Sequence, residues 1–165
     1  MLVGVVELDK KLAKLADDET IEKALRRACA RVMADAVNEA PADTGELRQS
    51  ITYEVEGKVG VVGTNLFYAP YVHQGTGEFA RDGNGREGYW VFVKGSGSGE
   101  QSSERKVYTL DQARQIVAIM RSEGLDAYYT HGQHPNPFLE RALDKNKDNI
   151  AQDFIDAIEE AVKDD

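Results

Sequence analysis

The chain has 165 residues, of which 41% are hydrophobic and 30% charged, with a mean hydropathy of −0.50. This composition suits one soluble domain, and no stretch approaches the roughly 20 apolar residues that a membrane span needs. A net charge of −9 argues against a nucleic-acid-binding surface over the whole fold, since phosphate binding needs clustered Lys and Arg.

Two features of the first third of the sequence bear on the cellular compartment in which the protein is made. The apolar start, residues 1–6, is short and lacks the basic leader of a signal peptide, so we expect synthesis in the cytosol. The single cysteine, Cys29, permits no internal disulfide and lies in a helical pattern. We therefore expect Cys29 to be a small buried hydrophobic residue rather than a reactive thiol.

Two helices are predicted before the first proline. Residues 7–16 suit a short helix, and Asp17 and Asp18 offer carboxylates that can cap a longer one. The longer helix must end before Pro41. Its apolar positions recur at helical spacing: Ile21, Leu25, Ala28, Val32 and Ala36. Three arginines among acidic residues indicate a solvated face: Arg26, Arg27 and Arg31.

A brief helical turn and a hairpin are expected next. Asp43 and Glu46, three residues apart, suit a capping pair for a turn that includes Leu47 and Ser50. Apolar residues alternate over residues 51–55, the chain turns at 56–58, and valines return it over 59–62. The pattern predicts two antiparallel strands.

An extended arm is predicted over about residues 79–106. Residues 89–93 are β-rich, and residues 106–108 suit the return strand of a long-tipped hairpin. The tip, residues 95–103, is rich in glycine and serine, so we expect it to be mobile in the free subunit and ordered by a neighbour.

An inserted helix and strand are predicted over about residues 109–130. Thr109 and Gln112 form a capping box that opens the helix, and Gly124 suits its C-terminal cap. Residues 127–129 suit a strand. Asn136 and Pro137 suit the start of a final helix, which the polar run 144–149 can bend or break.

The order of elements predicts a single α+β domain over residues 1–165. We expect a small antiparallel sheet of hairpins packed against a long N-terminal helix and a C-terminal helix. The arm and the inserted helix interrupt this arrangement.

Two motifs are candidates for a cofactor site or a metal site. Residues 83–88 match G-x-G-x-x-G, but they follow a polar loop and precede a strand, whereas a dinucleotide site follows a strand and opens a helix. A glycine-rich turn is the favoured interpretation. His131 and His134 offer two imidazoles, fewer than the three or four ligands of zinc, and we favour polar loop residues. We expect no cofactor, no metal and no catalytic residue.

Hydrolase chemistry remains an alternative. The chain has no G-x-S-x-G elbow for a nucleophilic serine. Paired carboxylates for hydrolysis stay open, because a chain with 29 Asp plus Glu always contains candidates.

Aromatic residues cluster around the central loops. Tyr and Trp outside a core favour protein interfaces, because they offer large contact area at low entropic cost. The candidates for an interface are Tyr89, Trp90 and Phe92.

Residues 40–51 carry a specific pattern. They resemble the A-P-x-D-T-G-x-L-x-x-S-I segment of a tail-component family of tailed phages, typified by gene product ten of a lambda-like coliphage. Similar elements follow in order: residues 62–65, residues 68–72, residues 75–77, and residues 132–143 as a closing element. The motif positions are Asp43, Thr44, Gly45, Leu47, Ser50, Tyr68, Tyr71, Gly75, Thr76, Pro137, Phe138 and Leu139.

The resemblance implies a structural virion protein of the phage neck. Such proteins are small α+β subunits that form rings, usually sixfold, between the portal vertex and the tail tube. The expected partners are other copies of the chain and the neighbouring connector and tail-tube proteins. DNA is expected to pass through the ring without specific binding, and no membrane is involved. A small phage-encoded hydrolase or nuclease is the alternative.

Overall fold

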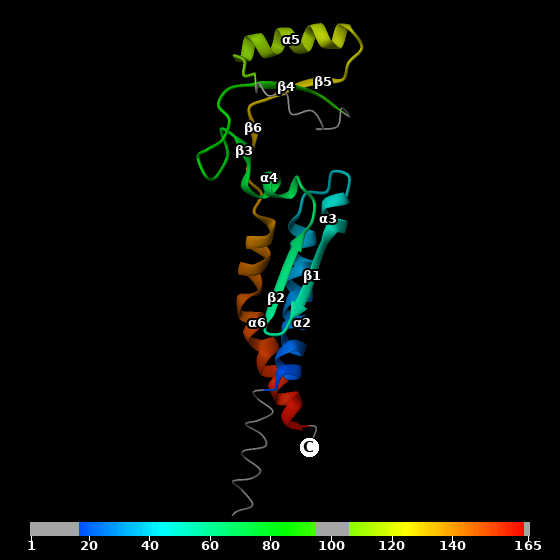
Figure 1. Cartoon of the computed structure of the whole chain (residues 1–165), viewed down its shortest axis with the longest axis vertical. Coiled ribbons are helices and arrows are strands. Elements are labelled where there is room, and N and C mark those ends of the chain that lie inside the picture. Colours follow the sequence, from blue (N-terminus) through cyan, green and yellow to red (C-terminus); the bar gives the residue numbers. More distant parts are fainter. Residues whose placement is uncertain (1–16, 95–105, 164–165) are drawn as a thin grey trace, which may run out of the picture. The chain divides into compact units, whose positions relative to one another are not determined.

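A computed structural model describes residues 17–94 and 106–163 (Figure 1). These residues form two compact units: unit 1 combines the chain up to Ala69 with the chain from Pro137 onward, and unit 2 is Pro70–Asn136. Helices and small antiparallel strand pairs make both units, so the expected α+β class is confirmed. The expected helix at 7–16 and the tip of the arm lie outside the described residues.

The long helix of unit 1, α2 (Asp18–Glu39), ends as the sequence predicts, with Ala40 as its C-cap before Pro41. Asp17 is the N-cap residue, but its side chain accepts no capping hydrogen bond. The buried face consists mostly of small residues: Thr20, Ala24, Ala28, Cys29, Val32 and Ala36. Small side chains let other elements approach the helix axis closely. The predicted burial of Cys29 is confirmed, and burial raises the pKa of its thiol.

The predicted hairpin is confirmed as β1 (Ile51–Glu56) and β2 (Val59–Thr64), joined by a two-residue turn. It follows a short helix, α3 (Glu46–Ser50), and its inner face packs on α2. Gly60 lies against this helix so closely that a Cβ atom would collide with Cys29 Sγ. The glycine therefore sets how near β2 comes to α2.

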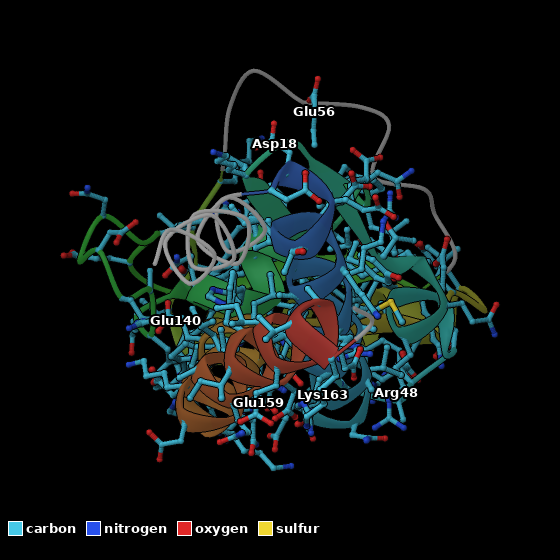
Figure 2. All side chains as sticks on the ribbon, turned by 90° about the horizontal axis from the view of Figure 1, so that it is seen from below. Asp18, Arg48, Glu56, Glu140, Glu159 and Lys163 are labelled. Atoms are coloured by element: carbon cyan, nitrogen blue, oxygen red, sulfur yellow. The ribbon has the colours of Figure 1, made fainter. Side chains whose placement is uncertain are left out.

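The final helix, α6 (Phe138–Lys163), is continuous, so it does not break at residues 144–149, one of the two predicted outcomes there. The reason is Asn146, which is buried and donates hydrogen bonds from Nδ2 to Asp35 Oδ2 at 2.6 Å and to the Ala142 carbonyl at 2.9 Å. Asn146 and Lys145 of this polar run in α6 thus have a polar partner, Asp35, on α2. Figure 2, which looks along the unit, shows α2 and α6 side by side.

A ladder of ion pairs joins α2 to α6, which run antiparallel. Its members are Lys23–Glu160 at 2.7 Å, Arg27–Glu160 at 2.8 Å, Arg31–Asp153 at 2.7 Å, Asp35–Lys145 at 2.6 Å and Glu39–Arg141 at 3.0 Å. The three arginine side chains are 54%, 37% and 48% exposed, as expected of a solvated face. Arg26 pairs with Glu22 on the same helix, whereas Arg27 and Arg31 pair with a helix distant in sequence, which was not predicted from the sequence.

Unit 2 contains two further strand pairs. β3 (Thr76–Gly77) pairs with β6 (Gly132–Gln133), and β4 (Trp90–Val93) pairs with β5 (Ala127–Thr130), all antiparallel. The expected return strand at residues 106–108 is wrong: only Tyr108 forms a bridge, to Tyr89, and the partner of β4 is β5. The helix α4 (Ala69–Gln74) leads into this unit.

The inserted helix is α5 (Leu110–Ser122), and its predicted ends are confirmed. Thr109 and Gln112 make both bonds of the capping box. At the other end Gly124 N donates to the Arg121 carbonyl and Leu125 N to the Met120 carbonyl, a Schellman arrangement, with Gly124 at φ +85°. Buried Ala113 and Val117 face the β4–β5 pair, along which α5 lies (Figure 1).

Candidate assembly surfaces

The corner after α2 is built by Thr44 and Gly45 rather than by Asp43. Gly45 is the N-cap residue of α3 at φ +80°, a conformation that favours glycine, and no side chain caps this helix. Thr44 Oγ1 accepts a hydrogen bond from Glu46 N at 3.4 Å, while Asp43 is exposed. The predicted Asp43–Glu46 capping pair is therefore wrong, and a threonine turn replaces the expected aspartate turn.

Leu47 and Ser50 tie this corner to the hairpin. Leu47 is 5% exposed, and Ser50 Oγ donates to the Leu47 carbonyl at 2.8 Å. Ser50 Oγ also lies 2.6 Å from Thr64 Oγ1, which accepts from Leu66 N at 3.2 Å. The last residue of α3, directly before β1, and the last residue of β2 are thus held together by their hydroxyl groups. These motif positions have structural roles.

Arg48 and Tyr68 complete the corner. Arg48 Nε donates to the Ala40 carbonyl at 2.8 Å, so a cation meets the C-terminal end of α2, where the helix dipole favours it. Tyr68 Oη donates to Glu46 Oε2 at 3.3 Å. Burial, and after it the nearby Glu46 carboxylate, raises the pKa of Tyr68. Arg48 is not among the motif positions named from the sequence, although it lies only eight residues after Ala40.

The expected close approach of backbones at residues 75–77 is confirmed within unit 2. Gly75 has φ +77°, and a Cβ there would lie 2.8 Å from the Phe79 carbonyl oxygen and 2.9 Å from the Gln133 carbonyl oxygen. Thr76 Oγ1 accepts from Gln133 N at 3.0 Å. Tyr71, another motif position, is 61% exposed.

The closing motif places one large side chain in the core of unit 1. Phe138 is fully buried, whereas Leu139 is half-buried. The Pro137 carbonyl accepts the first helical bond, from Arg141 N at 3.0 Å, so α6 begins one residue later than predicted. Asn136 N donates to the Val72 carbonyl at 2.9 Å.

The candidate interface residues divide between two faces of the β4–β5 pair. Opposed residues of an antiparallel pair share a face, so Trp90 with Thr130 and Phe92 with Tyr128 lie on one side. Phe92 and Tyr128 stack with centroids 5.8 Å apart and are 45% and 37% exposed. Tyr89 belongs with the other side, where its ring meets Tyr129 at 5.9 Å.

Two arginines lie over the first of these faces. Arg86 Cζ is 5.0 Å from the ring centre of Trp90, and Arg121 Cζ is 5.2 Å from that of Tyr128. Arg121 Nε donates to the Ala127 carbonyl at 2.9 Å, and Arg86 bonds to the Lys106 carbonyl. Both guanidinium groups are therefore held in place by backbone oxygens. Tyr128 was missed because nothing local in the sequence pairs β5 with β4.

The residues of the possible cofactor and metal motifs lie in unit 2. The rings of His131 and His134 lie 5.0 and 3.7 Å from the ring of Phe79. Within residues 17–94 and 106–163, no group of three or more Asp, Glu, His or Cys side chains is arranged to hold a metal ion. The glycine-rich run precedes β4 and opens no helix, and Gly83 and Gly88 have positive φ.

No helix in this same part of the chain combines the length and the apolar character that crossing a membrane requires. Residues 7–75 match the family model described as "Bacteriophage HK97-gp10, putative tail-component". No curated protein and no solved structure matches the chain. The match covers α2, the corner and the hairpin, and the closing element at residues 132–143 lies outside it. The resemblance in the sequence is thus confirmed over residues 7–75, which are similar to a family of phage tail components.

Proposed function

We propose that this chain is a structural protein of the phage neck, which completes the tail or joins it to the head by forming a ring of six copies between the connector and the tail tube. The observation that carries the proposal is the tail-component match over residues 7–75. The corner built by Thr44, Gly45 and Ser50 supports it, since it gives this segment a structural role.

The proposed partners are other copies of the chain and the adjoining connector and tail-tube proteins. A ring needs two different patches on each copy, joined head to tail, and a rotation that closes. Large exposed apolar side chains occur in both units, among them Val59 and Val61 in unit 1 and Phe92 in unit 2. Contacts of this kind are available without any change of fold.

The proposed ring lets DNA pass without holding it. Unit 1 contains 21 acidic and 13 basic residues, and unit 2 contains eight acidic and seven basic residues. Each unit therefore has a negative formal charge, whereas tight DNA binding requires lysine and arginine to release counterions. A gel-shift assay at moderate salt should show no tight duplex binding, and salt-sensitive submicromolar affinity would contradict this part of the proposal.

Antibody labelling of intact virions tests the location. Gold particles should mark the junction of head and tail, and assembly should take place in the host cytoplasm. Labelling confined to the capsid or the tail tip, or protein absent from purified virions, would overturn the proposal. The hydrolase or nuclease alternative predicts instead that the protein is absent from virions and cleaves nucleic acid or glycan in solution.

A further inference from the structure

Unit 2 has an open sheet surface of unusual composition, which we call the aromatic face. It is the side of β4–β5 that carries Trp90, Phe92 and Tyr128, with the guanidinium groups of Arg86 and Arg121 over two of the rings. The Asp126 carboxylate beside Tyr128 raises the pKa of that hydroxyl, and this single negative charge offsets only part of the charge of the two arginines. The opposite side of the same strands faces α5, as buried Ala127 indicates.

Unit 1 has an open sheet surface of complementary composition, which we call the hairpin face. In the β1–β2 register Glu54 lies opposite Val61 and Glu56 opposite Val59, so these four residues share the side that points away from α2. Val59 and Val61 are 61% and 58% exposed, and both glutamates are exposed. Glu56 points outward from the ribbon in Figure 2.

We propose that the aromatic face of one copy packs on the hairpin face of the next copy. This contact presupposes the proposed ring and supplies the two surfaces that build it. Each face is two strands wide and combines apolar side chains with charge, cationic on one and anionic on the other. Packing two sheets face to face would bury the valines on the aromatic rings and bring Glu54 and Glu56 to the arginines.

Two different faces give a head-to-tail contact, which can repeat around a ring. The chemistry favours a second copy over an unrelated protein, because each face supplies what the other lacks. The cationic groups are already fixed by backbone oxygens, so little side-chain freedom remains to be lost when they meet carboxylates.

Disulfide trapping in assembled particles tests the contact. Phage carrying both Val61→Cys and Phe92→Cys should give, on mild oxidation, a ladder of disulfide-linked multimers of the protein. The native Cys29 is buried and should not take part. The matched control is Val61→Cys with Ile119→Cys, because Ile119 is 60% exposed but lies on α5, away from the aromatic face.

The expected result is a ladder with the first pair and not with the control. A disulfide within single chains, an equal ladder with the control, or no ladder in intact particles would overturn the surface assignment. If rings form but the disulfide between positions 61 and 92 does not, the surface assignment fails and the proposed function is unaffected. Virions that complete their tails without this protein would overturn the proposed function itself.

A charge reversal provides an independent measurement. Glu54→Arg with Glu56→Arg changes only exposed side chains, so the variant should fold, and its incorporation into particles should fall by at least about tenfold. Glu123→Arg with Asp148→Arg makes the same change of net charge at exposed positions elsewhere and should assemble normally. Equal incorporation of both variants would contradict the proposal.

Discussion

Arg31 Nη2 lies 2.7 Å from Asp153 Oδ1 and so joins α2 to α6 across 122 positions of sequence. The Asp153 side chain is only 5% exposed, whereas that of Arg31 is 48% exposed. One carboxylate is therefore buried between the helices of unit 1 and depends on a cation at its edge. Such a pair contributes to the choice of register between helices, because breaking it leaves a buried charge without a partner.

Replacing Arg31 with Met keeps the aliphatic stem and removes that cation. We expect the urea midpoint of unfolding to fall at least about twice as far as it does in Arg26→Met. The Arg26 pair contributes less because its partner, Glu22, is 42% exposed. Adding Asp153→Leu to Arg31→Met should recover most of the loss, since no buried charge remains. Equal midpoints for the two arginine variants would show that the pair has no special role.

The acid side of the stability profile should depend on Glu160. Hydrogen bonds from Arg27 first and from Lys23 second lower the pKa of this carboxyl from 4.5 to about 2. Because the folded pKa lies below the unfolded one, the carboxylate stabilises the fold above about pH 4.5, and this contribution is lost as the pH falls toward 2. Urea unfolding as a function of pH measures the effect.

The Glu160→Gln variant should flatten the decline of stability over this interval of pH. Glu159→Gln is the control, because its ion pair with Lys163 at 3.2 Å lies within α6 and does not join the two helices. A decline of unchanged steepness in Glu160→Gln would mean that other carboxyl groups govern the acid transition.

A substitution at Gly60 tests how closely β2 approaches α2. Gly60→Ala should destabilise unit 1 by about 1–3 kcal/mol, the range for overpacking a filled core, because the new methyl group would collide with Cys29 Sγ. Gly63→Ala, on the same strand, is the control, since a Cβ there meets nothing within 4 Å. Combining Gly60→Ala with Cys29→Ala should restore part of the lost stability, as measured by thermal unfolding. Comparable losses from the two glycine variants would remove the collision as the cause.

The closing motif can be tested as a packing element. Phe138→Ala should cost about 3–5 kcal/mol, because it empties a fully buried aromatic site. Leu143→Ala, also on α6 but 47% exposed, should cost much less. Similar urea midpoints for the two variants would show that Phe138 does not anchor α6.

Features set by neighbouring residues could be predicted from the sequence. The capping box of Thr109 and Gln112, the glycine at the end of α5 and the β1–β2 hairpin all depend on contacts a few residues apart. The Asp43 prediction failed for a local reason, since Thr44 offers a competing oxygen one residue later.

Features set by distant partners could not be predicted in this way. In the sequence, the polar run that contains Asn146 predicts a bend or break in the final helix. In the structure Asn146 hydrogen-bonds to Asp35, 111 positions away, and the helix is continuous. Likewise β4 pairs with β5 rather than with the nearer residues 106–108, because α5 can cover one face of that pair. The aromatic residues were visible in sequence, but the grouping of Phe92 with Tyr128 depends on this non-local pairing.

Electron microscopy of particles made without this protein tests the central claim most directly. If the chain completes the neck, a phage with its gene interrupted should yield DNA-filled heads and separate tails, and supplying the protein in trans should restore joined particles. Complete virions with attached tails in the absence of the protein would contradict the account.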